Sequence, residues 1–334
     1  MATAAPPTLT LVLSRSDVLA LLTLPECIVA VEDAFRRHAE GRTLPPGVLA
    51  IPAAGGGFHV KAAGLTGEPG YFAAKINGNF PDNTGTGLPT IQGIVLVADA
   101  SNGVPLAVMD SGSITALRTG AATAVAAKHL ARRQSRTATV VGCGAQGEIQ
   151  LAALAAVLPL ERAWVLDVDP ARADRLAARA ATALGLSVEA ATDLPACLGQ
   201  SDVCVTCTPA RRPFVQRADI RAGTFIAAVG ADSQGKQELE PALMASATLV
   251  VDLLEQCATI GELQHALAAG LLTRDRVHAE LADVVTGRHP GRTRADEITI
   301  FDSSGTALQD VAAAALVYEK ACAARRGVEV RFDE

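Results

Sequence analysis

The spacing of hydrophobic residues changes along the chain, and each change predicts a different kind of structure. From Ser16 to Gly41 apolar residues recur at helical spacing with charges between them, which predicts two short helices broken near Pro25. Residues 42–110 alternate short apolar runs with Gly, Pro, Asn and Asp turns, a texture typical of an antiparallel or mixed sheet. The segment 79–89, NFPDNTGTGLP, contains too many helix and strand breakers to form an element, so we expect an active-site loop there.

A long Ala-rich run at 114–132 predicts a helix packed against other elements, and strands then alternate with helices. This alternation predicts a parallel sheet covered on both faces. From Thr306 the tail predicts one more helix, which we expect to return to the first domain. The expected strands of the parallel sheet are, in order, TATVV, RAWVLDV, VEAA, DVCVTCT, TFIAAVG and TLVVDL. The predicted fold class is therefore α/β, a Rossmann-type doubly wound sheet accompanied by a smaller α+β domain.

Composition narrows the protein class. The 334 residues are 49% hydrophobic but only 3% aromatic, so the core must be built mainly from Ala, Val, Leu and Ile. The net charge of −6 and the scattered basic residues provide no basic stripe, so nucleic acid is not an expected partner. The N-terminal sequence resembles no secretion signal, and no apolar stretch reaches the roughly 18 to 20 residues of a membrane helix, which favours a cytoplasmic protein.

The seven cysteines, an odd number, are expected to be buried thiols and not a disulfide framework. Cys204 and Cys207 form a CxxC, but they lie in an apolar strand sequence, where i and i+3 side chains point to opposite faces. A structural role is favoured for both residues. Apart from His59, the histidines show no ligand spacing, and no metal site is predicted.

A glycine turn provides the first functional signal. Gly142, Gly144 and Gly147 form G-x-G-x-x-G directly after a predicted strand and before a predicted helix. The first glycine permits the turn, the second admits a pyrophosphate, and the third allows close helix packing. Asp167, twenty positions beyond, can bind ribose hydroxyls and would repel a 2′-phosphate, so NAD is the expected cofactor. The alternative role of capping the next helix fits Asp169 better, because Asp169 directly precedes a proline.

Two lysines stand in apolar strand sequences, Lys61 in FHVKAAG and Lys75 in YFAAKING. A lysine in a central strand is costly unless it is paired or faces a cavity, so two in neighbouring segments suggest an anion site. The alternative is an edge strand whose lysines extend to solvent. His59, in the same segment as Lys61, is a further candidate for this site.

Two more residues complete the candidate chemistry. Arg118 lies in the Ala-rich helix, where its guanidinium could bind a carboxylate through two parallel hydrogen bonds. Asp232 follows the apolar strand TFIAAVG at its carboxyl end, the edge at which open parallel sheets bind ligands. A carboxylate in an apolar pocket at that edge can act as a general base.

Five motifs together resemble the ornithine cyclodeaminase/mu-crystallin family, which includes alanine dehydrogenases and ketimine reductases. They extend over nearly the whole chain and are far more specific than the glycine turn alone. The motifs are GLPTIQG at 87–93, GVPLAVMDSGSITALRTGAATAVAAKHLAR at 103–132, VVGCGAQ at 140–146, AVGADSQGKQEL at 228–239 and ITIFDSSGTALQD at 298–310.

The resemblance implies a homodimer with NAD as cofactor and a small amino acid or cyclic imine as substrate. Residues 1–117, completed by 309–334, would form the substrate-binding and dimerisation domain, and 118–308 the NAD-binding domain. The resemblance assigns substrate-carboxylate binding to Lys75 and Arg118 and acid–base catalysis to Asp232, so Asp232 and Lys75 are the expected catalytic residues. Arg118, Lys61 and His59 are the expected substrate-binding residues. The residues matched to the cofactor site are Gly142, Gly144, Ala145, Gln146, Asp167, Thr119 and Lys236.

Three reactions are compatible with these residues, and each begins or ends with hydride transfer at the α-carbon. The best single name is ornithine cyclodeaminase, which converts L-ornithine to L-proline and ammonia by hydride abstraction, cyclisation and hydride return. The alternatives are an NAD-dependent alanine-type dehydrogenase, a ketimine or imine reductase and, more remotely, a non-catalytic small-ligand-binding protein like the mu-crystallins.

Two departures from the family pattern affect the substrate pocket. Gly47 occupies the position of a basic carboxylate ligand, and we hypothesise that Lys61 supplies the missing charge. His59 occupies roughly the position of an acid that would meet the δ-ammonium of ornithine. An imidazole is a poorer partner for an ammonium, which weakens the case for ornithine.

Overall fold

The computed structural model describes residues 9–332, which divide into two compact units. One unit runs to Arg118 and resumes at Ala307, and the other spans Thr119–Thr306. Residues 1–8, on which part of the prediction about a secretion signal depends, lie outside the described residues. No helix within 9–332 has the length and apolarity needed to cross a membrane.

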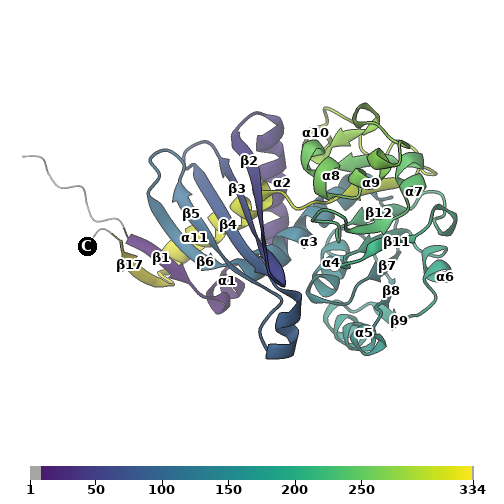
Figure 1. Ribbon diagram of the computed structural model, residues 1–334, viewed down its shortest axis with the longest axis horizontal. Coiled ribbons are helices and arrows are strands. Elements are labelled where there is room, and N and C mark those ends of the chain that lie inside the picture. The colour runs from purple at the N-terminus through teal and green to yellow at the C-terminus, as the bar shows by residue number, and fades with distance from the viewer. Residues whose placement is uncertain (1–8, 333–334) are drawn as a thin grey trace, which may run out of the picture. The chain divides into compact units, whose positions relative to one another are not determined.

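The first unit is built on a mixed seven-stranded sheet in the order β17-β1-β6-β5-β4-β3-β2 (Figure 1). Only the β1–β6 pair is parallel. The antiparallel or mixed sheet predicted for 42–110 is therefore confirmed, with antiparallel pairing among the strands of that range. The elements of this unit are β1 (Leu9–Leu13), α1 (Arg15–Leu21), α2 (Leu24–Ala39), β2 (Thr43–Ala53), β3 (Gly56–Leu65), β4 (Tyr71–Asn79), η1 (Pro81–Thr86), β5 (Ile91–Asp99), β6 (Pro105–Asp110), α11 (Ala307–Ala324) and β17 (Val328–Arg331).

The two predicted N-terminal helices are present, and each begins directly after a capping residue. Ser14 and Thr23 each form a capping box with an acid three residues later, which satisfies backbone N–H groups at both helix starts. Pro25 lies in the first turn of α2, where a missing N–H costs nothing. The break between the helices therefore falls just before Pro25.

The segment 79–89 was wrongly predicted to contain no element, because η1 forms within it. A short 3-10 helix needs only i to i+3 hydrogen bonds, and Pro81 at its start has a preset φ. Gly87 ends it in the left-handed region, at φ 80°. The breakers thus bound one short helix and do not exclude it.

The two faces of the first sheet differ. On one face α11 packs against β3 and β4, and Lys61, Lys75 and Asn77 point to this side. The strand register sets this arrangement because Lys61 lies directly opposite Lys75, and side chains alternate between faces. Since β3 and β4 are interior strands, the edge-strand alternative for the two lysines is wrong.

The second unit contains an eight-stranded, wholly parallel sheet in the order β15-β14-β16-β12-β10-β7-β8-β9. This is the predicted doubly wound sheet, and it includes one central strand that the pattern missed, β16. The elements here are α3 (Ser111–Leu130, shared with the first unit), β7 (Thr137–Val141), α4 (Ala145–Ala155), β8 (Arg162–Leu166), α5 (Pro170–Leu184), β9 (Ser187–Ala190), α6 (Leu194–Leu198), β10 (Val203–Thr206), β11 (Arg211–Val215), η2 (Arg217–Asp219), β12 (Phe225–Ala228), β13 (Gln237–Leu239), α7 (Pro241–Ser246), β14 (Thr248–Val251), α8 (Leu254–Ile260), α9 (Leu263–Ala268), η3 (Arg274–Arg276), β15 (Ala279–Glu280), α10 (Leu281–Val285) and β16 (Thr299–Asp302).

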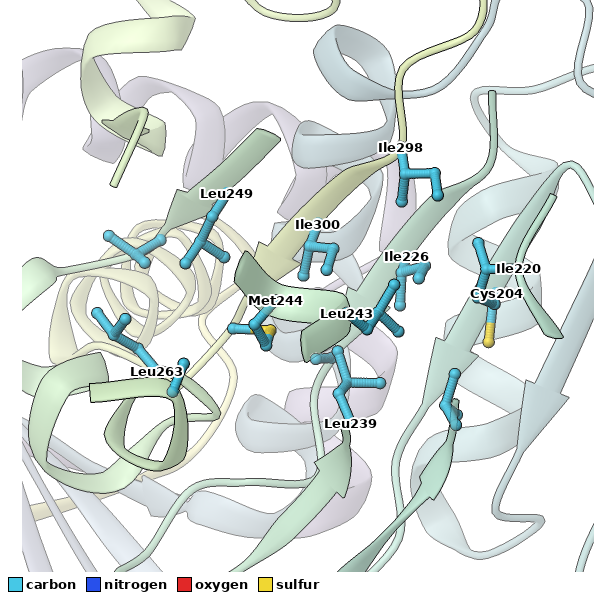
Figure 2. Packing of buried hydrophobic residues seen from close by; sticks show 14 of the residues in the cluster. Cys204, Ile220, Ile226, Leu239, Leu243, Met244, Leu249, Leu263, Ile298 and Ile300 are labelled. Atoms are coloured by element: carbon cyan, nitrogen blue, oxygen red, sulfur yellow. The ribbon is translucent and has the colours of Figure 1, made fainter. Parts of the chain in front are cut away.

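Aliphatic side chains fill one face of this sheet, as the low aromatic content requires. Ile226 and Ile300 from adjacent strands pack with Leu243 and Met244 of α7 (Figure 2). Cys204 is buried in the same cluster, and every cysteine is a free thiol. The structural role predicted for the Cys204 thiol therefore agrees with its surroundings.

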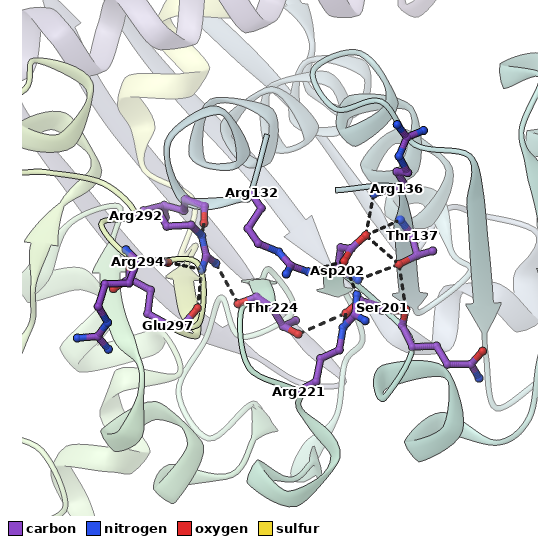
Figure 3. A network of polar contacts seen from close by, with 12 residues as sticks. Arg132, Arg136, Thr137, Ser201, Asp202, Arg221, Thr224, Arg292, Arg294 and Glu297 are labelled. Atoms are coloured by element: carbon purple, nitrogen blue, oxygen red, sulfur yellow. Dashed lines mark hydrogen bonds and ion pairs between the residues drawn. The ribbon is translucent and has the colours of Figure 1, made fainter. Parts of the chain in front are cut away.

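At the amino end of the strands, a polar network closes the sheet (Figure 3). Asp202 accepts hydrogen bonds from the backbone N–H groups of Arg136 and Thr137, at 2.7 and 3.1 Å, and pairs with Arg132 and Arg221. The network ties the starts of β7 and β10 together. It lies at the edge opposite the glycine turn, so we assign it to stability and not to ligand binding.

Candidate functional site

The glycine turn has the conformation that a dinucleotide site requires. Gly142 has φ 104°, and a Cβ there would lie 2.8 Å from the Cys207 carbonyl oxygen. A Cβ at Gly147 would lie 2.4 Å from the Gly142 carbonyl oxygen. A Cβ at Gly144 would meet no atom within 4 Å, which leaves space for a phosphate at the N-terminus of α4. Two glycines are thus required by packing, while the third leaves open the approach of a ligand.

Asp167, at the end of β8, lies beside this turn. Its carboxylate accepts hydrogen bonds from the N–H groups of Cys143, at 2.7 Å, and Asp169, at 2.9 Å. These bonds orient the carboxylate and leave further lone pairs for ribose hydroxyls. Asp169 is the N-cap of α5, accepting from the Ala171 N–H at 3.0 Å, as predicted.

The remaining predicted cofactor residues lie in several elements. Ala145 and Gln146 form the first turn of α4, and the Gln146 side chain accepts from Gln150 at 3.2 Å. Thr119 is buried on α3. Lys236 lies on the segment after β12 that also carries Asp232.

Lys75 and Arg118 come together in the first unit around a carboxylate that sequence reasoning missed, Asp310 of α11. Lys75 Nζ lies 2.8 Å and Arg118 Nε 3.0 Å from Asp310 Oδ1. Arg118 Nη1 also donates to Gln309 Oε1 at 2.7 Å. Lys75, Arg118 and Asp310 are 3%, 5% and 1% exposed, so water screens these charges poorly.

The charges of this cluster alter one another's protonation. Burial and the neighbouring Arg118 lower the pKa of Lys75 to about 7, although Asp310 opposes them. Burial alone would raise the pKa of Asp310, but Lys75 and Arg118 outweigh it and hold that pKa below its usual value. Asp310 is therefore an anion next to an arginine, and Lys75 releases its proton more readily than an exposed lysine.

Lys61 and His59 lie near this cluster but differ in burial. Lys61 is 7% exposed and lies close enough to influence the pKa of Lys75. His59 follows the same face of β3 and is half-buried. Gly47 pairs with Ala62, so a side chain at 47 would point to the face opposite Lys61. A basic residue at 47 and Lys61 would therefore occupy different positions.

Asp232 lies in the second unit, in the segment that follows β12. Its carboxylate is half exposed and accepts a hydrogen bond from Lys236 Nζ at 2.6 Å. This environment differs from the apolar pocket that the sequence suggested for Asp232.

Behind this segment lie three buried carboxylates, which sequence reasoning also missed. Burial, Asp302 and Glu238 raise the pKa of Glu262 to about 9. Burial raises the pKa of Asp302 to about 7 and also raises that of Glu238. Each nevertheless accepts backbone hydrogen bonds, which keeps it in the protein interior.

These raised pKa values predict that stability falls as pH rises. Folded Glu262 and Asp302 bind protons more tightly than the unfolded chain, whose values are near 4.5 and 3.8. Their contribution is complete below about pH 4 and is lost as pH rises toward about 9, at no more than about 1.4 kcal/mol per pH unit for each group. Glu262→Gln should flatten the dependence of the unfolding free energy on pH, measured by chemical denaturation between about pH 5 and 9.

The matched control is Glu255→Gln, which removes an exposed carboxylate of α8. It should keep the wild-type slope. A Glu262→Gln slope equal to that of the wild type would contradict the prediction, whatever the absolute stability of the variant. The lowered pKa of Lys75 makes its contribution to stability rise with pH above about 7. The pH slopes of the two variants must therefore be compared with each other and with the wild type.

Comparisons with known proteins agree with the motifs. The profile of the ornithine cyclodeaminase/mu-crystallin family matches residues 8–325. Alanine dehydrogenase of Archaeoglobus fulgidus is 38% identical over 97% of this chain and 98% of its own length. Among the described residues, no group of three or more His, Cys, Asp or Glu side chains is arranged to hold a metal ion.

Two solved structures are similar throughout their length. An archaeal alanine dehydrogenase dimer with bound NAD has a TM-score of 0.93 at 37% identity, covering 97% of this chain and 99% of its own. The Δ1-pyrroline-2-carboxylate reductase of Thermococcus litoralis, in complex with NADH and L-proline, has a TM-score of 0.92 at 34% identity, covering 96% and 100%. The chain therefore belongs to the ornithine cyclodeaminase/mu-crystallin family.

Proposed function

We propose that this protein is an NAD-dependent enzyme acting at the α-carbon of a small L-amino acid or its imine, as an alanine-type dehydrogenase or an imine reductase. The observation that carries the proposal is the buried cluster of Lys75, Arg118 and Asp310. The cluster holds two cations but only one carboxylate, so its charges can bind a ligand that brings a second carboxylate. The glycine turn and Asp167 support NAD as the cofactor.

The substrate carboxylate is bound by Lys75 and Arg118. Arg118 supplies planar donors, while Lys75 supplies a point charge from the adjacent sheet. Because Asp310 contacts both side chains, it limits their motion before the substrate arrives. An arriving carboxylate favours the protonated form of Lys75, so substrate binding and proton uptake are linked.

Asp232 carries the proton of the substrate amine. When bound, NAD supplies the hydride chemistry at the α-carbon. In the direction of oxidation, the Asp232 carboxylate accepts an ammonium proton, because only the neutral amine can assist loss of hydride. In reduction it returns that proton to the product amine. The Lys236 ammonium donates a hydrogen bond to this carboxylate and so orients it.

Ornithine cyclodeaminase is the second candidate, since the same residues would serve it and the GADSQGK segment retains Asp232. Ornithine requires a carboxylate for its side-chain ammonium. In the described cluster Asp310 already pairs with two cations, and the nearby side chains of His59 and Lys61 are basic. This favours a substrate without a second amine.

Product analysis with matched substrates tests the proposal. We expect steady NADH formation from L-alanine or another small amino acid, or NADH consumption with a cyclic imine or a 2-oxo acid plus ammonia. Proline and ammonia formed from L-ornithine with only catalytic NAD would establish the cyclodeaminase instead. Binding of NAD without any of these reactions would contradict an enzymatic role and favour a small-ligand-binding protein.

We also propose that the protein is a homodimer that uses the outer face of the first sheet. Apolar side chains on this face alternate with those that point toward α11, and Leu49, Ile51, Phe58, Ile76 and Ile94 are all more than 40% exposed. Such a patch marks an interaction surface. Ile76→Lys is therefore expected to convert dimers into monomers, measured by size-exclusion chromatography with light scattering.

Leu19→Lys provides the control for this change, since Leu19 is an equally exposed apolar residue on α1 and lies outside the sheet face. It should leave the dimer intact. A dimeric Ile76→Lys variant, or a monomeric wild type at micromolar concentration, would contradict this use of the sheet face.

A further inference from the structure

Glu238, on β13, is a fully buried acid with three well-defined hydrogen bonds. Its Oε1 accepts from both the backbone N–H and the hydroxyl of Thr208, each at 2.7 Å. Its Oε2 accepts from the N–H of Gly230 at 2.9 Å. One carboxylate therefore binds two separate segments of backbone.

The two segments are the continuations of adjacent parallel strands. Thr208 follows β10, Gly230 follows β12, and these strands pair in register with Thr206 opposite Ala228. Glu238 thus bridges the strands at their carboxyl ends, the edge at which an open parallel sheet binds ligands. The segment from Gly230 to Lys236, which carries Asp232, begins at this bridge.

Close packing at the bridge leaves no room for a side chain at Gly230. A Cβ at Gly230 would lie 2.4 Å from Glu238 Cδ and 2.4 Å from the Thr208 carbonyl oxygen. Such distances do not occur between non-bonded atoms, so only glycine fits here. The Glu238 side chain is therefore in direct contact with the backbone two residues before Asp232.

Further hydrogen bonds hold the backbone of Glu238 in place. The Glu262 carboxylate accepts from the N–H groups of Glu238, at 2.6 Å, and Leu239, at 3.2 Å. Asp302 accepts in turn from the N–H groups of Glu262 and Leu263, at 3.0 and 2.9 Å. Each carboxylate holds the backbone of the next, and the series ends at Gly230.

The other end of the Asp232 segment is bonded to α9. The N–H of Gly235 donates to Gln264 Oε1 at 3.0 Å, and the His265 ring nitrogen lies 2.7 Å from the Lys236 carbonyl oxygen. Between these anchors the Asp232 side chain is half exposed and contacts Lys236. The backbone is thus held at both ends, while the side chain at its centre remains accessible.

We propose that Glu238 is a positioning residue, whose carboxylate holds the Gly230–Lys236 segment so that Asp232 occupies one place. This inference rests on the proposed function of Asp232 as the acid–base group. Proton transfer requires the carboxylate within hydrogen-bond reach of the amine, so a small displacement of the segment lowers the rate. A glutamine at 238 keeps one acceptor oxygen and replaces the other with an NH₂ group, which only donates, so this NH₂ would face an N–H of either Thr208 or Gly230.

The test compares Glu238→Gln with Glu240→Gln. Glu240 also accepts a backbone hydrogen bond, from the Arg217 N–H at 2.7 Å, but this bond lies outside the Asp232 segment. We expect Glu238→Gln to lower kcat by about 10- to 100-fold, with the KM for the amino acid and the NADH dissociation constant within about two-fold of wild type. NADH binding is measured by fluorescence titration, and Glu240→Gln should match the wild type in all three quantities.

Hydrogen exchange provides a second readout that does not depend on turnover. Peptides covering 229–236 should exchange faster in Glu238→Gln than in Glu240→Gln, while peptides from β7 and β8 stay unchanged. Should Glu238→Gln fail to fold, Thr208→Val, which removes one of the three donors, is expected to cause a smaller change of the same kind.

Two results would overturn the inference: wild-type kcat in Glu238→Gln, or unchanged exchange in 229–236. A parallel loss of NADH binding and faster exchange throughout the second unit would also overturn it, because this marks general unfolding. A wild-type protein that turns over no amino acid or imine would overturn the proposed function. In that case the exchange comparison still decides whether Glu238 holds the segment.

Discussion

Asp232→Asn is expected to lower turnover by about 10²- to 10⁴-fold, the range that general acid–base groups contribute. The amide cannot accept the proton of the substrate amine, but it has nearly the same size and still bonds to neighbouring groups. NAD binding should stay unchanged, because the glycine turn and Asp167 lie elsewhere in the unit. Steady-state kinetics with the preferred substrate and a fluorescence titration with NADH measure the two quantities.

Asp193→Asn is the matched control, since Asp193 is an exposed carboxylate that caps α6 through the Ala196 N–H. Asparagine caps helices equally well, so this variant should retain wild-type turnover. Unchanged turnover in Asp232→Asn would remove Asp232 from the acid–base role. Loss of NADH binding in that variant would instead indicate a structural role.

Asp310→Asn is expected to destabilise the protein by about 3–5 kcal/mol, the cost of leaving buried charges without their partner. Lys75 and Arg118 would both lose the carboxylate that compensates them, and both side chains are almost fully buried. The free energy of unfolding from urea denaturation measures this loss. The KM for the substrate should rise as well, because Lys75 and Arg118 would no longer be held in place.

Glu319→Gln is the control for Asp310→Asn on the same helix. Glu319 is exposed and accepts from the Tyr71 hydroxyl at 3.0 Å, so its replacement should cost about 1 kcal/mol or less. Equal stabilities of Asp310→Asn and Glu319→Gln would contradict the importance of the buried charge cluster. A substrate that stabilises Asp310→Asn strongly would support it, because the added carboxylate replaces the missing charge.

Much of the fold followed from local patterns. Alternating apolar runs predicted the mixed sheet, and alternating strands and helices predicted the parallel one, because both signals depend on residues within a few positions. The central strand β16 was missed, since TIFD is short and stands between a breaker-rich loop and a polar turn. The helix η1 was missed for a related reason, because proline and glycine can begin and end a 3-10 helix as well as interrupt it.

The sequence by itself determined the glycine turn, its acid Asp167 and the family motifs, because these chemical requirements are carried by residues close together in the chain. It also indicated that Lys75, as a lysine in a central strand, has an anionic partner or faces a cavity, since buried cations are costly without one. A single acid in the apolar helix sequence TALQDVAAAALV was the available signal for that partner.

Only the tertiary structure decided that this partner is Asp310, 235 residues beyond Lys75 in the chain, because α11 returns to the first sheet. It alone also decided that Lys61 and Lys75 lie on interior strands and face each other, since strand order and register depend on contacts that no local pattern encodes. The series of buried carboxylates that supports the Asp232 segment was likewise decided only by the tertiary structure. Glu238, Glu262 and Asp302 are ordinary acids in sequence, and they acquire their role because four parallel strands, β10, β12, β16 and β14, end at one edge.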